Sequence, residues 1–379
     1  MKILVLGAGR MAYGVVHDFH THLEEVEIHI TDISEKALKF IQRHFKSKRL
    51  ITHRIKADDV VRIPALMKKM DGVLSAVPYE YNLQLTRWAI ENTCHFVDLG
   101  GNNTVVDRQF KLDAKAKKAD VGVIPDCGLA PGMASVLAVH LTDQFDRVDT
   151  LTIRVGGLPL HPQNPLQYML VFSVHGLINE YIEPAMIIQD GKIATVPSMT
   201  ATEELEFPAP FGKLEAFYTS GGTSTLPQTY LGKINNLNYK TIRYPGHGHL
   251  FKAMIDLGFT SDRPLTIGKN KVNRREVFEK LLLEPLSYQS EDVVLIRLRA
   301  KGTRNGVDQQ LTCEAIEYGD RSSKLTAMMR TTAFPAAIIL IMLMDGRIKA
   351  RGVMRQELAV PPVAFMTEMQ KRNISFNIY

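Results

Sequence analysis

The sequence predicts an α/β protein in which a doubly wound parallel sheet of the Rossmann type carries an inserted α+β domain with a mostly antiparallel sheet. Over the first 130 residues, apolar strands alternate with helical patterns, the order that builds a parallel sheet. Later strand-like runs cluster without regular helices between them. A chain of 379 residues is long for one domain. We therefore expect a Rossmann domain at 1–130, an α+β domain at 131–330 and a segment at 331–379 that returns to the Rossmann domain.

The composition is that of an ordinary soluble globular protein, with 23% charged and 45% hydrophobic residues. The net charge of +6 comes from basic residues scattered along the chain, so we expect no nucleic-acid partner. The three cysteines, Cys94, Cys127 and Cys313, are far apart and have neither zinc-site nor CxxC spacing. This spacing predicts reduced thiols and no bound metal.

The hydropathy of the chain predicts no membrane association. The most apolar run, Ala336–Met344, is far shorter than the roughly 20 residues that a bilayer needs. We interpret this run as a buried helix with Pro335 in its first turn. Because the chain opens directly on an apolar strand, we expect no signal peptide and a cytoplasmic location.

The glycine turn at residues 7–12 is the feature around which we expect the chain to be organised. Gly7 permits a tight exit from the first strand, and Gly9 lets the backbone approach a diphosphate without a Cβ in the way. Ala12 keeps the following helix close to the strand. The diphosphate would lie on free N–H groups at the helix N-terminus. The turn residues expected to bind a cofactor are Gly7, Gly9, Arg10, Met11 and Ala12.

Twenty residues after Ala12, the apolar strand Val26–Ile30 leads to Asp32. A carboxylate at this position accepts hydrogen bonds from the adenosine ribose hydroxyls and would repel a 2′-phosphate, which favours NAD over NADP as cofactor. The alternative is a glycine turn in an unrelated α/β protein followed by an incidental aspartate. Strand, turn, helix, second strand and acid together favour the dinucleotide.

The remaining elements of the first domain follow in order. We expect strands at 51–55, 72–76, 95–99 and 121–124, and helices at 34–45, 58–70, 82–91 and 107–118. In an open parallel sheet, ligands bind at the carboxyl ends of the strands. The residues at these ends that we expect along the cofactor are Ala76, Val77, Pro78, Asp98 and Gly100. A plain turn role is the alternative for Pro78.

The second domain has a different pattern. Alternating runs at 148–155, 292–301, 310–318 and 324–331 predict strands. The region from Gly156 to Gly248 is dense in Gly, Pro, Ser and Thr, which predicts long loops. Loops of that length in a compact domain usually bind ligands or act as lids.

Several strings along the chain carry a resemblance to a known family. They are PDCGLAPGM at 125–133, VGGLP at 155–159, FSVHGLINEY at 172–181, EAFYTSGGTSTL at 215–226, YKTIRYPGH at 239–247 and RTTAFPAA at 330–337. With these strings the chain resembles the saccharopine dehydrogenase-like family over nearly its whole length. The resemblance implies a Rossmann domain, an inserted α+β domain and a C-terminal return. It also implies a homo-oligomer, since members of this family assemble as oligomers.

Two departures from the family pattern bear on the substrate. Members that act on saccharopine usually have Asp at the position of Ala130 and an Arg in the loop that here reads TSGGTST. An arginine fork is the natural clamp for the extra dicarboxylic arm of saccharopine. The resemblance therefore implies NAD-dependent oxidative deamination of the ε-amine of L-lysine, giving 2-aminoadipate 6-semialdehyde and ammonia. Saccharopine, or a related opine-type substrate, remains the alternative.

Oxidation of an amine by hydride transfer requires the neutral amine, so the site needs a proton acceptor. Asp126 is the first candidate, because it follows a strand end where the two predicted domains should meet; an N-cap or turn role is the alternative. His175 titrates in a useful range but stands near a predicted helix start, where histidines are often only capping or surface residues. His247 has a glycine-loop setting and ranks no higher than His175.

The substrate would be held by hydroxyl, backbone and cationic groups together with aromatic rings. A helix opening at Thr223 would provide N–H donors for the α-carboxylate of lysine. The candidates are Tyr79, Tyr168, Thr219, Ser220, Gly222, Thr223, Lys240 and Thr241, with Gly221, Ser224 and Arg243 beside them. For the loop residues the alternative is a capped turn, for Lys240 and Arg243 a solvated face, and for the tyrosines a core position. The nucleotide domain alone would also fit an NAD-binding sensor without turnover.

Overall fold

The structure is a computed structural model that describes residues 1–379. The chain divides into two compact units, which we describe separately. Unit 1 contains residues 1–140 and 329–375, and unit 2 contains residues 141–328 and 376–379. The return to unit 1 thus ends at residue 375, because the last four residues belong to unit 2, where strand β18 (Asn377–Ile378) pairs with β16 (Val307–Tyr318).

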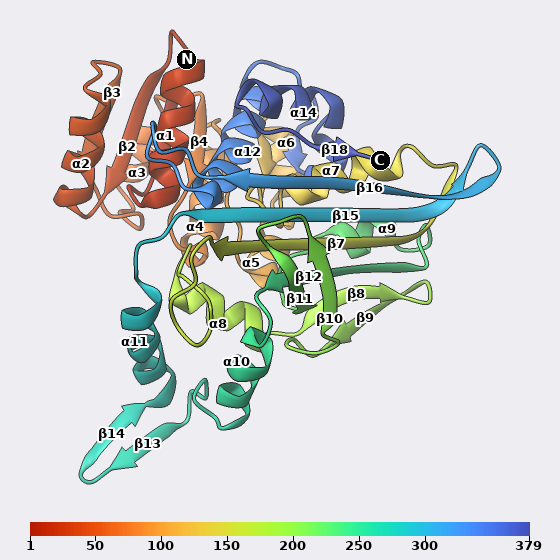
Figure 1. Ribbon diagram of the computed structural model, residues 1–379. Coiled ribbons are helices and arrows are strands. Elements are labelled where there is room, and N and C mark those ends of the chain that lie inside the picture. The colour runs from red at the N-terminus through yellow and green to blue at the C-terminus, as the bar shows by residue number, and fades with distance from the viewer. The chain divides into compact units, whose positions relative to one another are not determined.

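Unit 1 is built on a seven-stranded parallel sheet with the order β17-β6-β5-β4-β1-β2-β3 (Figure 1). Its strands are β1 (Lys2–Leu6), β2 (Glu27–Asp32), β3 (Leu50–Arg54), β4 (Gly72–Ser75), β5 (His95–Asp98), β6 (Gly122–Ile124) and β17 (Gly352–Val353). Every neighbouring pair is parallel. The order of the first six strands is the doubly wound Rossmann order, so the predicted fold class is confirmed. The C-terminal segment adds β17 as a seventh strand.

Helices flank these strands. They are α1 (Arg10–His22), α2 (Glu35–Phe45), α3 (Arg62–Met67), η1 (Tyr79–Tyr81), α4 (Asn82–Glu91), α5 (Asn103–Phe110), α6 (Asp113–Lys118), α7 (Met133–Thr142), α12 (Ala327–Met344), α13 (Gln356–Ala359) and α14 (Pro362–Lys371). The single helix predicted at 107–118 is two helices, α5 and α6. Asn102 caps α5 by accepting a hydrogen bond from the Val105 N–H at 3.1 Å, which moves the helix start four residues earlier than expected.

Helix α12 corrects two predictions. It begins at Ala327, so Pro335 lies inside it and not in its first turn, and the strand predicted at 324–331 is wrong. The reason is a tertiary cap: both carboxylate oxygens of Asp292 accept hydrogen bonds from the first N–H groups, those of Ala327 at 2.6 Å and Met328 at 2.9 Å. By length and hydropathy α12 could cross a membrane, but 78% of it is buried within the protein, as in core helices of soluble proteins.

Unit 2 contains a nine-stranded mixed sheet. Seven strands follow the order β10-β11-β12-β7-β15-β16-β18, and β8 joins β9 to β12. The strands named here for the first time are β7 (Arg147–Pro159), β8 (Ala185–Gln189), β9 (Lys192–Val196), β10 (Glu203–Phe207), β11 (Gly212–Tyr218), β12 (Asn236–Arg243) and β15 (Asp292–Arg304). Only β12 and β7 are parallel, so the mostly antiparallel sheet is confirmed. Figure 1 shows β7, β15 and β16 as long neighbouring arrows.

The region from 156 to 248 was predicted as loops, and this prediction is wrong. It contains five strands, β8 to β12, and the helices α8 (Val174–Ile182) and α9 (Leu226–Tyr230); α10 (His247–Asp256) begins at its end. The glycines at its start lie within β7, and a Cβ on Gly156 would come within 2.5 Å of the Ile242 carbonyl oxygen. Glycine here allows close strand packing, which the sequence alone does not distinguish from a turn. The remaining elements are the hairpin β13 (Pro264–Ile267) and β14 (Asn270–Asn273), and α11 (Arg274–Leu286).

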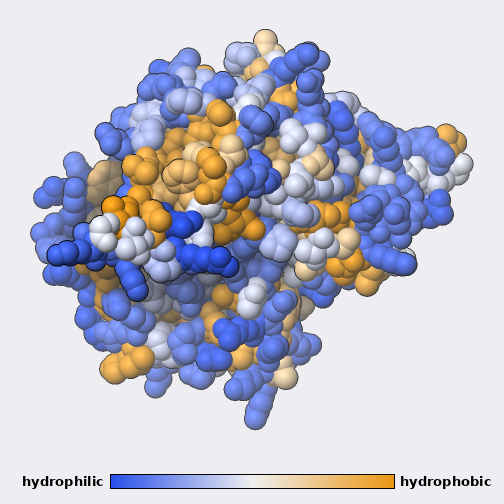
Figure 2. All heavy atoms as spheres, turned by 90° about the horizontal axis from the view of Figure 1, so that it is seen from below, coloured by the Kyte–Doolittle hydropathy of each residue, from blue (hydrophilic) through white to orange (hydrophobic).

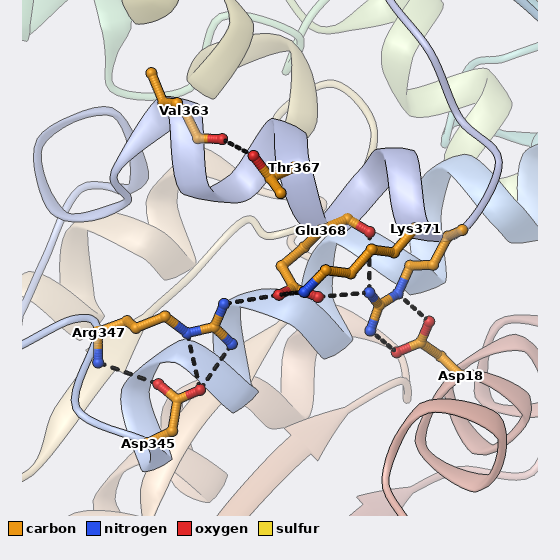
Figure 3. Close-up of polar contacts among 8 residues, drawn as sticks. Asp18, Asp345, Arg347, Val363, Thr367, Glu368 and Lys371 are labelled. Carbon is orange, nitrogen blue, oxygen red and sulfur yellow. Dashed lines mark hydrogen bonds and ion pairs between the residues drawn. The ribbon is translucent and has the colours of Figure 1, made fainter.

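A buried ion network fastens the C-terminal helix α14 to α1 within unit 1 (Figure 3). The Arg372 guanidinium donates to both carboxylate oxygens of Asp18 and, at 2.9 Å, to Glu368. Asp18 and Arg372 are almost fully buried, with 0% and 1% of their side chains exposed. Burial opposes ionisation of Glu368, but hydrogen bonds from Lys371, Arg347 and Arg372 prevail and lower its pKa to about 2. Glu368 therefore stays ionised at neutral pH.

We predict that Arg372→Met lowers the free energy of unfolding by about 3–5 kcal/mol, because the Asp18 carboxylate would remain buried without its cation. Lys371→Met is the matched control: its side chain is 61% exposed and it pairs with the same Glu368, so we expect a loss below about 1 kcal/mol. Urea unfolding of both variants gives the two values. Equal losses would show that the buried pair contributes no more than a surface pair.

Candidate functional site

The glycine turn between β1 and α1 has the geometry expected of a dinucleotide site. Gly7 has a φ of +96°, and its N–H donates to the Thr31 carbonyl at 2.8 Å. A Cβ at Gly7 would come within 2.8 Å of the Ala76 carbonyl oxygen and 3.2 Å of Val77. A side chain is therefore excluded at this position both by the backbone angle and by the neighbouring strand end.

Gly9 is the N-cap residue of α1, and a Cβ placed on it would meet no atom within 4 Å. No side chain caps this 13-residue helix, and its first turn contains no acidic residue. Ala12 is fully buried against the core, whereas Gly9 and Arg10 are exposed. The open turn and the uncapped N–H groups fit a diphosphate, since a helix N-terminus favours negative charge.

Asp32, at the end of β2, is tied to the glycine turn. Its Oδ2 accepts a hydrogen bond from the Ala8 N–H, and its Oδ1 accepts one from the Ser34 N–H, both at 2.7 Å. The side chain is only partly buried. Each carboxylate oxygen retains further acceptor capacity for a ribose hydroxyl. Asp32 is thus held next to the turn by the backbone.

The carboxyl ends of β5 and β6 bring three predicted residues together. Asp98 is fully buried and accepts hydrogen bonds from the Gln109 amide at 2.7 Å, the Gly100 N–H at 2.8 Å and the Asp126 N–H at 3.1 Å. Burial raises the pKa of Asp98, and these hydrogen bonds oppose that shift. Asp126 has a φ of +61° and is 2% exposed. Asp98 therefore organises this edge of the sheet and orients Asp126.

Gly100 and Gly101 leave space for two neighbouring side chains. A Cβ on Gly100 would fall on Oδ1 of Asp126, far inside van der Waals contact. A Cβ on Gly101 would come within 3.0 Å of the Tyr79 ring. Ala76, Val77 and Pro78 lead from β4 into η1, which begins at Tyr79. The predicted cofactor residues of unit 1 thus lie along the carboxyl ends of β1, β2, β4 and β5, and the predicted catalytic residue Asp126 follows β6.

In unit 2, a buried cation lies among aromatic rings. Arg243, at the end of β12, is 3% exposed and stacks over the Tyr168 ring, with 4.7 Å between the guanidinium carbon and the ring centre. Its Nε donates to the Tyr181 hydroxyl at 2.8 Å, and that hydroxyl contacts Nε2 of His247 at 3.0 Å. Burial and the nearby Arg243 lower the pKa of His247 to about 3, so the imidazole is neutral. Arg243 forms no salt bridge within the chain.

Glu180, in the last turn of α8, is a candidate that the sequence reasoning missed. Burial raises its pKa to about 7, and Arg243 partly opposes the shift. Its carbonyl accepts a hydrogen bond from the Ser220 N–H at 2.9 Å, but its side chain forms no hydrogen bond or salt bridge within the chain. The side chain keeps some surface exposure. The only sequence signal was its position in FSVHGLINEY, where an acid next to Tyr181 interrupts an apolar helix.

Strand alternation separates two residues that the sequence reasoning had grouped. Thr241 faces the Arg243 side of β12, where its hydroxyl lies 2.6 Å from that of Thr219. Lys240 points to the opposite face and donates to Glu203 at 2.7 Å and to the Ala201 carbonyl at 2.6 Å. The Lys240 charge is therefore already balanced by a carboxylate.

The other predicted residues of the loop at 219–225 contact neighbouring elements of unit 2. Ser220 lies next to α8, and its hydroxyl donates to the Asn179 carbonyl at 3.4 Å. A Cβ on Gly222 would fall on the Tyr239 ring, and Thr223 donates to the Met186 carbonyl at 3.1 Å. No helix opens at Thr223, because α9 begins at Leu226 and has only five residues, so the helix N-terminus that would provide N–H donors at Thr223 is absent.

Two further candidates lie apart from each other. Tyr168 is fully buried in an apolar cluster, where it contacts Arg243 and His247. His175 is 55% exposed and pairs with Glu279 of α11 at 2.9 Å, so it does not contact the other predicted site residues.

No group of three or more His, Cys, Asp or Glu residues that could hold a metal occurs. A surface hollow of about 590 Å³ runs along α2 and is lined by none of these candidates.

Comparisons with known proteins identify the family. A model described as the saccharopine dehydrogenase NADP binding domain matches residues 3–124, and one described as the saccharopine dehydrogenase C-terminal domain matches residues 128–374. The chain belongs to the saccharopine dehydrogenase family. The family expected from the sequence strings is thus confirmed, and the chain carries an NAD(P)-binding domain of an oxidoreductase family.

Individual relatives are distant. The chain is 25% identical to a saccharopine dehydrogenase [NADP(+), L-glutamate-forming] of Pyricularia oryzae, over 67% of this chain and 57% of that protein. It is 22% identical to the mitochondrial alpha-aminoadipic semialdehyde synthase of Rattus norvegicus, over 93% of this chain and 45% of that protein. The chain thus spans about half the length of these curated relatives. The apo saccharopine dehydrogenase (L-Glu forming) of Saccharomyces cerevisiae shares the fold, with a TM-score of 0.82 at 19% identity over 100% of this chain and 99% of that one.

We predict that Gly100→Ala displaces the Asp126 carboxylate and lowers the melting temperature, because the new methyl group would occupy the position of Oδ1. Gly346→Ala is the matched control: Gly346 has nearly the same φ, +79° against +75°, but open space around it. We expect the control to lose about 1 kcal/mol from backbone strain alone and Gly100→Ala to lose at least about 1 kcal/mol more. Calorimetry of both variants measures the difference, and equal losses would contradict the steric account.

Proposed function

We propose that this protein is an NAD-dependent lysine 6-dehydrogenase, which oxidises the ε-amine of L-lysine. The observation that carries the proposal is the pair formed by Arg243 and Glu180. Arg243 is a buried guanidinium that forms no salt bridge, and Glu180 is a carboxyl group that interacts with its charge but accepts no hydrogen bond from it. An amino acid supplies the missing partners, since it offers one carboxylate and one or two ammonium groups.

The lack of a further cation in the loop favours lysine over saccharopine. The loop at 219–225 contains only Thr, Ser and Gly residues, and Ala130 stands where saccharopine-specific members usually have Asp. Lys240 is engaged by Glu203 and offers no free charge for a second dicarboxylic arm. The Thr219 and Thr241 hydroxyls provide neutral donors on the face that Arg243 shares. These groups suit L-lysine better than saccharopine, its glutarate adduct.

Asp32 favours NAD over NADP. A 2′-phosphate would come close to a carboxylate that the Ala8 and Ser34 N–H groups hold in place. The family model that matches this region is described as an NADP binding domain, so the cofactor is a specific point to test. The Gly7, Gly9 and Ala12 turn would hold the diphosphate, and Ala76 to Pro78 would follow the cofactor along the strand ends.

The chemistry requires one proton acceptor and one hydride acceptor. Bound NAD would supply the acceptor for the hydride that leaves the ε-carbon. Before that transfer, the ε-ammonium has to lose a proton, because only the neutral amine has the lone pair that forms the carbon–nitrogen double bond. Asp126 and Glu180 are the two carboxyl groups proposed for this proton. Water then adds to the imine carbon, and ammonia leaves with the semialdehyde as product.

A substrate assay distinguishes the three candidate functions. We expect NADH absorbance to rise with NAD and L-lysine, with one ammonia released for each NADH, and not with saccharopine or ornithine. A rise with saccharopine alone would identify a saccharopine dehydrogenase. Binding of NAD without turnover of any of the three would identify a sensor. NADP in place of NAD should give a much lower kcat/KM.

Asp32→Ala should weaken NAD binding by at least about tenfold, because the ribose hydroxyls would lose a charged acceptor worth about 1.5–3 kcal/mol. Asp32 also holds the Ala8 N–H, so the melting temperature is measured in parallel. An unchanged dissociation constant for NAD in titration calorimetry would remove Asp32 from the ribose site.

Glu180→Gln should lower kcat/KM for lysine by about a hundredfold and abolish the pH dependence near neutrality. A carboxyl group accepts a proton only when ionised, and the pKa of Glu180 is about 7, so activity should rise with pH through 7 in the parent protein. Glu183→Gln, three residues further along, is the control and should keep both the rate and the profile. An unaltered pH profile in Glu180→Gln would leave Asp126 as the proton acceptor.

A further inference from the structure

Contacts on three sides hold the guanidinium of Arg243 in one orientation. Hydrophilic side chains cover much of the molecular face that Figure 2 shows, but Arg243 is 3% exposed. Its guanidinium lies over the Tyr168 ring, its Nε donates to the Tyr181 hydroxyl, and its Nη1 donates to the Ile242 carbonyl at 2.8 Å. Nη2 forms no hydrogen bond within the chain, and Nη1 keeps a second N–H. These remaining N–H groups can donate to a carboxylate.

His247 is a buried residue at the start of helix α10, and the function proposed above does not use it. Its side chain is enclosed by aromatic rings, and it stacks on Phe217 with 6.3 Å between the ring centres. The N–H groups of Gly246 and Gly248, on either side of His247, donate to the two carboxylate oxygens of Glu215 at 2.9 Å and 2.6 Å. The backbone that carries the imidazole is therefore fixed on both sides.

The hydrogen bonds of His247 determine which ring nitrogen carries the proton. Nδ1 lies 2.8 Å from the Leu166 carbonyl oxygen, which can only accept a hydrogen bond, so Nδ1 is protonated. Burial and, to a smaller extent, the nearby Arg243 lower the pKa of His247 to about 3, so Nε2 has no proton at neutral pH. Nε2 therefore accepts a hydrogen bond from the Tyr181 hydroxyl, which lies 3.0 Å away.

The Tyr181 hydroxyl connects this histidine to Arg243. Because its proton points to His247, its oxygen is left to accept the hydrogen bond from the Arg243 Nε at 2.8 Å. The hydrogen bonds thus run in one direction, from Arg243 through Tyr181 and His247 to the Leu166 carbonyl. The opposite histidine tautomer would turn a lone pair toward that carbonyl, so the direction is fixed.

We propose that Tyr181 and His247 are positioning residues, which aim the remaining N–H groups of Arg243 at the carboxylate of the amino-acid substrate. The inference rests on the proposed function, in which an amino acid supplies the carboxylate that Arg243 lacks. His247 transfers no proton in the reaction, since its imidazole is an acceptor within the hydrogen-bonded chain. Loss of this chain should weaken binding of the carboxylate and leave the hydride transfer nearly unchanged.

The first test reads the histidine itself and needs no substrate. In the full chain with nitrogen-15 in its histidines, nuclear magnetic resonance should show His247 as the neutral Nδ1–H tautomer from about pH 5 to about pH 9, because its pKa is about 3. The variant His247→Gln assigns the signal by its loss. An Nε2–H tautomer or a charged ring in this range would overturn the proposal.

The second test is ligand binding to Tyr181→Phe, which removes only the hydroxyl. In titration calorimetry with NADH present, the Kd values of L-lysine and L-norleucine should rise at least about tenfold, because a hydrogen bond to a charged group is lost. Cadaverine, which is lysine without its carboxylate, should bind within about twofold of the parent. An equal loss of affinity for cadaverine would overturn the proposal, because the effect would not depend on the carboxylate.

Tyr244→Phe is the matched control for this substitution. Tyr244 follows Arg243 directly, but its hydroxyl donates to the Pro159 carbonyl at 2.9 Å and does not contact the guanidinium. The control should keep all three affinities. The melting temperatures of both variants check that they are folded.

Two substitutions of His247 distinguish positioning from proton transfer. His247→Gln retains an acceptor for the Tyr181 hydroxyl, whereas His247→Leu has none. We expect the KM for lysine to rise at least about tenfold in His247→Leu and less than about threefold in His247→Gln, with kcat within about threefold of the parent in both. A large and equal fall of kcat in both variants would identify His247 as an acid or base and overturn the proposal.

The positioning role and the proposed function fail on different results. If lysine is not oxidised but norleucine binds the parent and binds Tyr181→Phe at least about tenfold more weakly, only the lysine 6-dehydrogenase activity is refuted. If norleucine binds both proteins equally, the positioning role is refuted, whichever substrate is oxidised. A parent protein that binds neither lysine nor norleucine would refute both.

Discussion

The close packing of α12 on the sheet and on helix α1 of unit 1 is the constraint on which the rest of that unit depends. Three glycines make it possible: a Cβ on Gly14 would lie 2.8 Å from Ala333, one on Gly72 would lie 2.6 Å from Met344, and one on Gly122 would lie 2.5 Å from Leu343. Because α12 fits against these positions, the C-terminal segment can continue on the same unit, where it adds β17, α13 and α14. The Arg372–Asp18 pair then fixes the end of that segment to α1.

The same sheet holds its polar groups at the carboxyl ends of the strands. Asp98 receives three hydrogen bonds, and one of them positions the backbone of Asp126. The Gln356 amide, in the orientation that satisfies both of its ends, donates to the Asp126 carbonyl from the C-terminal segment. Segments far apart in sequence therefore keep a residue with a positive φ in place. Residues that several surrounding segments hold in an unusual backbone conformation are typical of functional sites.

In unit 2, two positive charges are buried on the same strand, and only one of them forms a salt bridge. Lys240 and Arg243 lie on one strand, yet Lys240 is balanced by Glu203, whereas Arg243 contacts aromatic rings, a tyrosine hydroxyl and the Ile242 carbonyl and forms no salt bridge. A buried guanidinium without a salt bridge is costly, so such a position is a candidate for anion binding. Glu180, with its raised pKa, adds the complementary acid nearby.

The sequence by itself determined the doubly wound sheet, the glycine turn, Asp32 and the strand-end residues, because these follow from local periodicity and from residues close together along the chain. Only the tertiary structure decided the rest. The start of α12 depends on a cap from Asp292 in β15, and the strands between 156 and 248 depend on glycines that act through close packing. The separation of Lys240 from Thr241 required knowing which residues of β12 face Arg243. Glu180 was missed because its pKa is set by burial and by a cation 63 residues away in the chain, and no spacing rule encodes that contact.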